Sequence, residues 1–286
     1  MAAAYGILLF ITLIWGATFP LIQMALEDAS PFAFVAIRFS IATLIFGALF
    51  FKRFLRLSRA NLIQGVILGA FLCGGYVLQT MGLARTTAAR SGFITGLLVP
   101  LTPVFAWLLF RTHVSLRLWL AVVLAFAGLG IMSQPEAGGF NFGDLLTLGG
   151  AILFALHVAC ISQWARPSNE MALTGLQLAT TAVIAAMIVP FETGAHYDAS
   201  IRLLAITLFA AAFASAFAIA MQVKYQPRIS PAAAAVIYAC EPIFAGISAR
   251  VILHHTPPTA TLFGAGFIVA GMILSSLPAK SSLTKT

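Results

Sequence analysis

The stretch LTPVFAWLLFR at residues 101–111 recurs in the second half of the chain as CEPIFAGISAR at residues 240–250. In this alignment Pro103 corresponds to Pro242, and apolar positions fall opposite apolar positions. Self-similarity of this kind is the signature of an internal repeat. The chain is therefore expected to contain two copies of one structural unit.

The segments that follow these two stretches also match, with AGLGIMS at 127–133 and AGMILSS at 270–276. Counting the apolar runs around them gives five helices in each unit, so the predicted repeats are residues 1–138 and 139–286. Because five is an odd number, the second repeat enters the membrane from the opposite side. Inverted repeats of this kind are typical of transporters, which bind their substrate near the bilayer midplane where the repeats meet.

The composition predicts an all-α integral membrane protein. Of the 286 residues, 61% are hydrophobic and 8% are charged, whereas a soluble domain carries about 25% charged residues. So much apolar surface must face lipid. Ten apolar runs are long enough to be transmembrane helices: 5–26, 31–51, 62–82, 90–110, 117–133, 144–164, 171–190, 201–222, 230–253 and 259–277.

The basic residues predict the orientation of these helices. If the N-terminus is cytoplasmic, eleven Lys and Arg residues lie inside: Lys52, Arg53, Arg56, Arg59, Arg111, Arg117, Arg166, Lys224, Arg228, Lys280 and Lys285. Only four lie outside: Arg85, Arg90, Arg202 and Arg250. This bias predicts that both termini are cytoplasmic. With short loops and no targeting segment, a multi-pass protein of the bacterial inner (plasma) membrane is expected.

Signals for catalysis and for cofactors are missing from the sequence. The cysteines Cys73, Cys160 and Cys240 lie singly inside apolar runs, which argues against a disulfide framework or a metal site. There is no phosphate-binding glycine loop, no HExxH pair and no serine elbow. We expect a protein that is not an enzyme and has no cofactor. Its expected partners are the lipid bilayer and a small molecule, with no nucleic acid, and it could act as a monomer.

Charged side chains inside the expected helices are candidates for the site, because polar groups within a membrane are costly. Glu241 is the only carboxylate deep in such a helix, and Pro242 follows it. It could bind a proton or the amino group of a substrate, or it could be a structural group paired with Arg38. Arg38 in turn could bind a substrate carboxylate in bidentate fashion, or it could hold helices together.

Other polar and aromatic side chains share helix faces. His157, Cys160 and Trp164 lie at i, i+3 and i+7. The remaining candidates for substrate binding are Trp15, Thr18, Tyr76, Gln79, Thr95, Thr102 and Tyr238. Together they could form an aromatic pocket for a zwitterion with an apolar side chain, although some of these aromatic residues could instead face lipid. The prolines expected to act as hinges are Pro20, Pro100, Pro103 and Pro242.

Three motifs resemble those of a known family: WGATFP at 15–20, SPFAFVAIRF at 30–39, and the pair Glu241–Pro242. With the repeat, they resemble the EamA-type branch of the drug/metabolite transporter superfamily. The resemblance implies a basket-like fold of ten helices and alternating access. It also implies a central cavity lined by helices 1, 3, 4, 6, 8 and 9. Within the branch, the chain is most similar to YddG-like amino-acid exporters.

This resemblance implies export of amino acids or similar small metabolites. One departure concerns proton coupling, because Trp15 lies near the position where small four-helix relatives carry a membrane glutamate. An exporter of drugs or organic cations that uses Glu241 is an alternative. A lipid-handling protein or an intramembrane enzyme is less favoured, since no polar constellation has catalytic spacing. Sugar-phosphate transport would require a cluster of basic residues, and Arg38 alone does not supply one.

Overall fold

The structure is a computed structural model that describes residues 2–50, 58–111, 116–132, 139–229, 234, 237–238, 240–254 and 259–276. Within these ranges the regular structure is helical, apart from one isolated antiparallel bridge between Ala29 and Tyr197. The α-helices are α1 (Ala2–Ala25), α2 (Pro31–Phe50), α3 (Arg59–Leu83), α4 (Ala88–Thr95), α5 (Leu98–Phe110), α6 (Leu116–Met132), α7 (Phe142–Trp164), α8 (Glu170–Ile188), α9 (Ile201–Phe209), α10 (Ala218–Tyr225), α12 (Glu241–Ile252) and α13 (Thr259–Ser276). The shorter elements are the 3₁₀-helices η3 (Val189–Phe191) and η5 (Gln226–Arg228), and the π-helix η4 (Ala210–Phe217).

Seven helical stretches of the described chain are long and apolar enough to cross a membrane. They are Ala3–Ala25, Pro31–Phe50, Arg59–Leu83, Ala88–Phe110, Phe142–Trp164, Glu170–Phe191 and Ile201–Arg228. Each coincides with one of the apolar runs expected from the sequence. The other three expected runs, 117–133, 230–253 and 259–277, coincide with the shorter helices α6, α12 and α13 or lie partly outside the described residues. The total of ten spans therefore stays a prediction.

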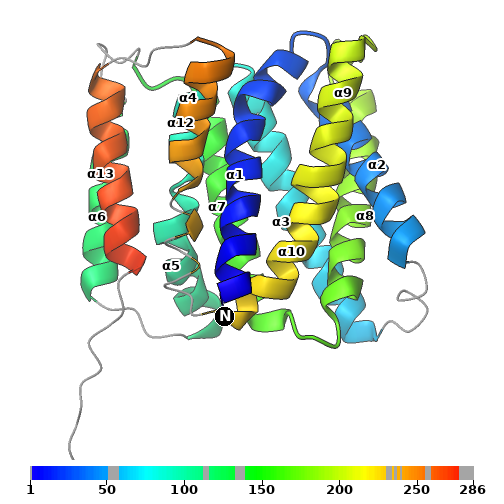
Figure 1. Cartoon of the computed structure of the whole chain (residues 1–286), viewed down its shortest axis with the longest axis horizontal. Helices are drawn as coiled ribbons and strands as arrows, with labels where there is room; N and C mark the ends of the chain where they lie inside the picture. The colour runs from blue at the N-terminus through cyan, green and yellow to red at the C-terminus, as the bar shows by residue number, and fades with distance from the viewer. Residues whose placement is uncertain are drawn as a thin grey trace, which may run out of the picture.

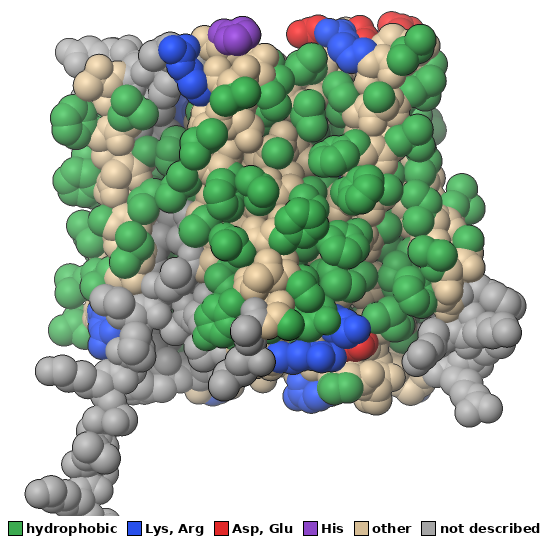
Figure 2. All heavy atoms as spheres, viewed as in Figure 1, with side chains coloured by type: hydrophobic (Ala, Val, Ile, Leu, Met, Phe, Trp, Pro, Cys, Tyr) green, Lys and Arg blue, Asp and Glu red, His purple; other side chains and the backbone are tan. Residues whose placement is uncertain are grey.

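The helices stand roughly side by side, as Figure 1 shows. On the face drawn in Figure 2, hydrophobic side chains cover the band between the two ends, and the charged side chains gather at the ends. Large apolar side chains such as Leu44, Met187 and Phe191 are 72%, 67% and 85% exposed. Exposed apolar residues in this number would be unfavourable in water, and they fit a surface that contacts lipid.

The expected run 90–110 is a broken helix. Helix α4 ends at Thr95 and α5 begins at Leu98, with 3₁₀-type hydrogen bonds from Leu97 N to Ile94 O and from Val99 N to Gly96 O. Pro100 has no N–H to donate to the Gly96 carbonyl, so the α-helical ladder cannot continue through this point. The break lies beside the cavity described below.

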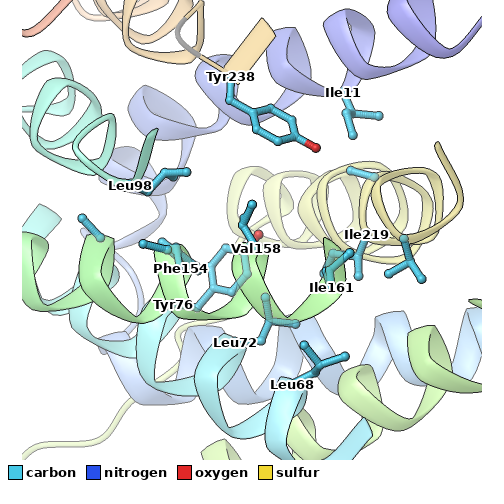
Figure 3. Packing of buried hydrophobic residues seen from close by; sticks show 14 of the residues in the cluster. Ile11, Leu68, Leu72, Tyr76, Leu98, Phe154, Val158, Ile161, Ile219 and Tyr238 are labelled. Carbon is cyan, nitrogen blue, oxygen red and sulfur yellow. The ribbon is translucent and has the colours of Figure 1, made fainter. Parts of the chain in front are cut away.

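The bundle is held together by a small set of helix pairs. Helix α6 packs on α13, α3 packs on both α7 and α8, α2 packs on α8, and α1 packs on α12. The largest apolar cluster joins α1, α2, α3, α5, α7, α8 and α10 in the interior, and Figure 3 shows part of this cluster. These contacts place α12 next to α1 and α4, on one wall of the interior space.

The first turn of α12 approaches α1 and α4 very closely. A Cβ atom at Gly16 of α1 would lie 2.5 Å from Phe244 Cβ and 2.9 Å from the Glu241 carbonyl oxygen. A Cβ atom at Gly92 of α4 would lie 2.5 Å from Ala245 Cβ. Small residues allow helix backbones to approach in lipid, where packing replaces the hydrophobic effect as the driving force. These two glycines therefore set the position of Glu241.

Polar side chains form an ion pair and hydrogen bonds at one end of the bundle. This is the end where α1 ends and α2 begins, and it is the upper end in Figure 1. Arg90 Nη2 lies 2.8 Å from Asp144 Oδ2, and both side chains are buried. Asp144 also forms a capping box with Asn141 at the start of α7 and accepts a hydrogen bond of 2.9 Å from the Thr86 hydroxyl. This cluster ties α4 to α7.

A second, more exposed cluster joins the α1–α2 loop to the start of α9. Arg202 forms ion pairs of 2.8 Å with Glu27 and 2.9 Å with Asp28. Hydrogen bonds from Arg202 and from the Ser200 hydroxyl hold the pKa of the Asp28 carboxyl below its usual value. Because these groups are exposed to solvent, each pair is expected to contribute about 1 kcal/mol or less to stability.

The substitution Gly16→Ala tests the close approach of α1 and α12. Its new methyl group overlaps with the first turn of α12, and overpacking of this kind costs about 1–3 kcal/mol. We expect a lower midpoint of thermal unfolding in detergent. Gly6→Ala is the matched control in the same helix, because no atom lies within 4 Å of a Cβ at that position. Equal midpoints for the two variants would contradict the described packing.

The substitution Asp144→Ala tests the buried ion pair. It leaves the Arg90 guanidinium without its carboxylate, and removing one partner of a buried pair costs about 3–5 kcal/mol. Glu27→Ala, at a side chain that is 61% exposed, is expected to cost about 1 kcal/mol or less. Denaturant titrations in detergent, followed by circular dichroism, measure both free energies of unfolding. A loss for Asp144→Ala no larger than that for Glu27→Ala would count against a stabilising buried pair.

Candidate functional site

A cavity lies among the helices, and about 570 Å³ in and around it, open solvent included, is free of protein atoms. Its walls come from α1, α3, α4, α5, α7, α10 and the residues just before and at the start of α12. Figure 3 shows Tyr238 on one side, with Tyr76 and Phe154 across from it. The lining residues are Trp15, Thr18, Phe19, Leu72, Tyr76, Gln79, Thr95, Leu98, Phe154, His157, Val158, Ile219, Gln222, Tyr238 and Glu241.

Most of the candidates chosen from the sequence border this cavity. They are Trp15, Thr18, Tyr76, Gln79, Thr95, His157, Tyr238 and Glu241. They come from five segments of the chain, namely α1, α3, α4, α7 and residues 238–241. The structure therefore brings them together around one space, as a binding pocket requires.

Four other candidates do not border the cavity. Thr102 donates a hydrogen bond of 2.7 Å to the Leu98 carbonyl within α5. Cys160 is buried in the apolar cluster. Trp164, the last residue of α7, packs edge to face against Phe110 at 6.3 Å between ring centroids. The fourth is Arg38, which lies behind the wall of the cavity.

Arg38 is completely buried and is held by aromatic rings. Its guanidinium carbon lies 4.5 Å from the centroid of the Tyr76 ring and 5.3 Å from that of Phe39, and its Nε donates to the Ser215 hydroxyl at 2.8 Å. The two terminal nitrogens have no hydrogen-bond partner among the described residues. Arg38 thus supports Tyr76 from behind, and Tyr76 separates it from the cavity.

Glu241 contributes the only carboxylate to the described lining of the cavity. It is the first residue of α12 and is 8% exposed. The pairing with Arg38 that was considered from the sequence is not present, and Glu241 forms no ion pair with any other described residue. None of the described lining residues is Lys or Arg. The carboxylate is therefore available to a ligand or a proton.

The aromatic walls are held in place by hydrogen bonds and ring contacts. Trp15 Nε1 donates to the Ala214 carbonyl at 2.9 Å, and its ring lies 6.1 Å from that of Tyr238. Ala214 belongs to the π-helix η4, an element frequently found at functional sites. Tyr76 packs edge to face on Phe154 at 5.1 Å. These rings offer flat apolar surface and π-faces that attract a cation.

Two buried hydrogen bonds join lining residues to neighbouring groups. Gln79 Nε2 donates to the Thr95 hydroxyl at 3.1 Å, which links α3 to the end of α4. His157 Nε2 lies 2.6 Å from Gln177 Oε1, which links α7 to α8. Gln177 itself is fully buried and does not border the cavity. The polar groups of the lining are thus fixed in orientation by partners outside or at the edge of the cavity.

The candidate hinge prolines occupy two kinds of position. Pro100 and Pro242 lie in the first turns of α5 and α12, where a missing N–H is tolerated. Pro20 and Pro103 lie inside α1 and α5, where each removes one hydrogen bond from the helix. Their role as hinges stays a prediction.

Several lining residues were not among the candidates. Phe19, Leu72, Leu98, Phe154, Val158 and Ile219 are apolar residues in apolar helices, so nothing in the sequence distinguishes them from residues that face lipid. Gln222 is polar, and its position in an expected span was a usable signal. Among the described residues, no group of three His, Cys, Asp or Glu side chains is placed to share a metal ion.

Comparisons with known proteins agree with this architecture. The model of the EamA-like transporter family matches the chain over residues 3–134 and again over 141–277. An uncharacterized transporter of Archaeoglobus fulgidus is 34% identical over 270 residues, which cover 94% of this chain and 84% of that protein. A second uncharacterized transporter of the same organism is 25% identical, and the alignment covers 92% of this chain and 94% of that protein.

Two further matches are more distant or shorter. The uncharacterized transporter YvbV of Bacillus subtilis is 28% identical over 176 residues, which cover 60% of this chain and 58% of that protein. A crystal structure of a protein with 20% sequence identity superimposes with a TM-score of 0.71 and covers 96% of both chains, so the two share a fold. With its apolar helices and its internal cavity, and with a family match across both halves, the chain belongs to the EamA-like transporter family.

Proposed function

We propose that the protein is a secondary transporter that moves small amine-bearing metabolites, amino acids with apolar side chains among them, across the inner membrane. The observation that carries this proposal is the cavity, which aromatic rings share with a carboxylate that has no ion pair among the described residues. Glu241 would bind the amino group, and the rings of Trp15, Tyr76 and Tyr238 would cover the apolar part. In such a pocket the aromatic rings supply most of the contact area with the ligand, and a few polar groups fix the orientation of the ligand.

The proposed architecture is ten transmembrane helices in two inverted repeats, 1–138 and 139–286, with both termini in the cytoplasm. Two observations support it. The family model matches each half separately, and the helix contacts occur in related pairs. In the alignment of the halves, α1 corresponds to α7 and α4–α5 to the segment with α12, and the contact of α1 with α12 has its counterpart in the contacts of α7 with α4 and α5.

Alternating access around the cavity is the proposed mechanism. On the side of the cavity toward η5, the Tyr238 hydroxyl donates to Gln226 Oε1 at 3.1 Å. Gln226 Nε2 in turn donates to Ser162 Oγ at 2.7 Å and to the Val158 carbonyl at 3.2 Å. These bonds connect three segments at one end of the cavity, and opening toward that end would require them to separate. With the termini in the cytoplasm this end faces the cytoplasm, and we propose export as the direction of net flux.

A transporter of drugs or other organic cations is the second candidate. The observation that favours it is the absence of Lys and Arg from the described lining residues. A free amino acid carries a carboxylate, which finds no cationic partner in this lining. A ligand with a positive charge and no negative charge would match Glu241 and the aromatic faces without that cost.

A counterflow assay in proteoliposomes tests transport itself. The probes are pooled labelled amino acids and, in parallel, labelled aromatic amines that lack the carboxylate. We expect saturable exchange of at least one pool, and we expect Trp15→Ala to weaken the apparent affinity about tenfold or more, because a large buried contact is lost. Trp107→Ala is the matched control, since Trp107 is 42% exposed on the outer surface. Exchange of neither pool by folded protein would refute the proposal.

The substitution Glu241→Gln tests the role of the carboxylate with almost no change in shape. It removes the negative charge from the cavity, so we expect saturable exchange of amines to be lost while the protein remains folded. Glu27→Gln, at an exposed side chain in the α1–α2 loop, should exchange like the wild type. Amino-acid exchange that survives in Glu241→Gln while amine exchange is lost would separate the two candidate substrate classes. Unchanged exchange of both would remove Glu241 from the mechanism.

A further inference from the structure

His157 borders the cavity through one nitrogen and is bonded to the protein through the other. Nε2 lies 2.6 Å from Gln177 Oε1. Nδ1 forms no hydrogen bond with a described residue. It is also not one of the side-chain atoms that are fully enclosed by protein and lack a hydrogen-bond partner. Since His157 lines the cavity, Nδ1 is the nitrogen that faces it.

The hydrogen bond between Nε2 and Gln177 determines whether Nδ1 of His157 donates or accepts a hydrogen bond. The structure turns the amide oxygen of Gln177 toward the ring and leaves the amide nitrogen without a partner among the described residues. An amide oxygen accepts hydrogen bonds and cannot donate them, so in this orientation Nε2 carries the proton. A neutral imidazole has only one N–H, and Nδ1 is then left with a lone pair. The cost of burying another charge keeps the ring neutral in the absence of a hydrogen-bonded carboxylate. Gln177 therefore makes His157 a hydrogen-bond acceptor toward the cavity.

The charges around the cavity indicate what such an acceptor would bind. Glu241 is the only formally charged group among the described lining residues, and it too accepts hydrogen bonds. An acceptor on His157 and an acceptor on Glu241 match a ligand with several N–H donors and a positive charge. A quaternary ammonium ion has the charge and suits the aromatic rings, but it has no N–H to donate.

We propose that Gln177 is a positioning residue that fixes the tautomer of His157, and that the resulting acceptor selects protonated primary and secondary amines over quaternary ammonium ions. This inference rests on the proposed transport function and names the substrate feature that the cavity recognises. Gln177 acts without touching the ligand, because it is fully buried and does not border the cavity. A neighbouring group sets the tautomer of a histidine in the same way when it holds one ring nitrogen.

The transport test compares phenethylamine with its N,N,N-trimethyl derivative as competitors in counterflow of labelled phenethylamine. A hydrogen bond with a charged partner favours the primary amine in the wild type by about tenfold or more. His157→Phe and Gln177→Leu should clearly reduce this preference, of which the Glu241 carboxylate keeps a part. Thr174→Val is the control in the same helix, because Thr174 is equally buried and bonds only to the Glu170 carbonyl. It should keep the wild-type ratio.

The variant Gln177→Met separates hydrogen bonding from packing. Methionine has nearly the length of glutamine but no amide oxygen, and its sulfur is only a weak acceptor, so Nε2 loses the group that holds its proton. We expect Gln177→Met to reduce the preference for the primary amine as Gln177→Leu does. If Gln177 served only to fill space, Gln177→Met would keep the wild-type preference, and that result would overturn the proposal.

The tautomer can also be observed directly, without transport and in the wild-type protein. Solid-state NMR of protein labelled with ¹⁵N-histidine in lipid, with His157→Phe to assign the signal, reports which ring nitrogen carries the proton. We expect the proton on Nε2 in the wild type and a changed distribution in Gln177→Leu. A proton on Nδ1 would overturn the inference even if amines are transported. If neither amine is exchanged but the proton is on Nε2, the proposed function fails, and with it the selectivity for amines.

Discussion

The close approach of three backbones at the first turn of α12 is the constraint on which the site depends. Gly16 on one side and Gly92 on the other leave no room for a side chain, so α12 begins against α1 and α4. This contact determines where Glu241 stands, because Glu241 is the first residue of the helix. In a membrane such an approach is stabilised by packing alone. The position of the charge is therefore set by the absence of side chains on its neighbours.

The two buried charges in the interior are kept apart. Arg38 is stacked on Tyr76 and Phe39 and bonded to Ser215, while Glu241 faces the cavity with no ion pair among the described residues. A direct pair would have lowered the cost of burying both groups. It would also have neutralised the carboxylate that a ligand could use. The arrangement leaves the stabilising ion pair to Arg90 and Asp144 at the end of the bundle.

The sequence was sufficient for the long apolar helices and for many of the cavity residues. Polar groups such as Gln79 and Glu241 stand out in an apolar helix because they are costly there, and both border the cavity. Helical periodicity was a weaker guide to position along the axis. His157 and Trp164 share a face, but a rise of 1.5 Å per residue separates them by about 10 Å. The cavity reaches His157 only.

Other features could not be inferred because they depend on contacts between distant segments. The break between α4 and α5 has a local cause in Pro100, but its position beside the cavity depends on α3 and α7. The role of Gln177 depends on its contact with His157, which is twenty residues away in the chain. A buried amide in one helix gives no sign of its partner until the helices are placed next to one another. The apolar lining residues Leu72 and Ile219 are likewise identified only by the fold.

The two halves of the chain are related in sequence, yet they contribute differently to the cavity. The residue aligned with Glu241 is Thr102, whose hydroxyl is bonded to the Leu98 carbonyl in its own helix and which does not border the cavity. Among the described lining residues, the formal charge therefore comes from the second half, to which His157 and its partner Gln177 also belong. A ligand held by Glu241 and His157 would be bound mainly to the second half while it contacts the rings of Trp15 and Tyr76 in the first. Rocking of one half against the other would then change the aromatic contacts and leave the polar ones in place.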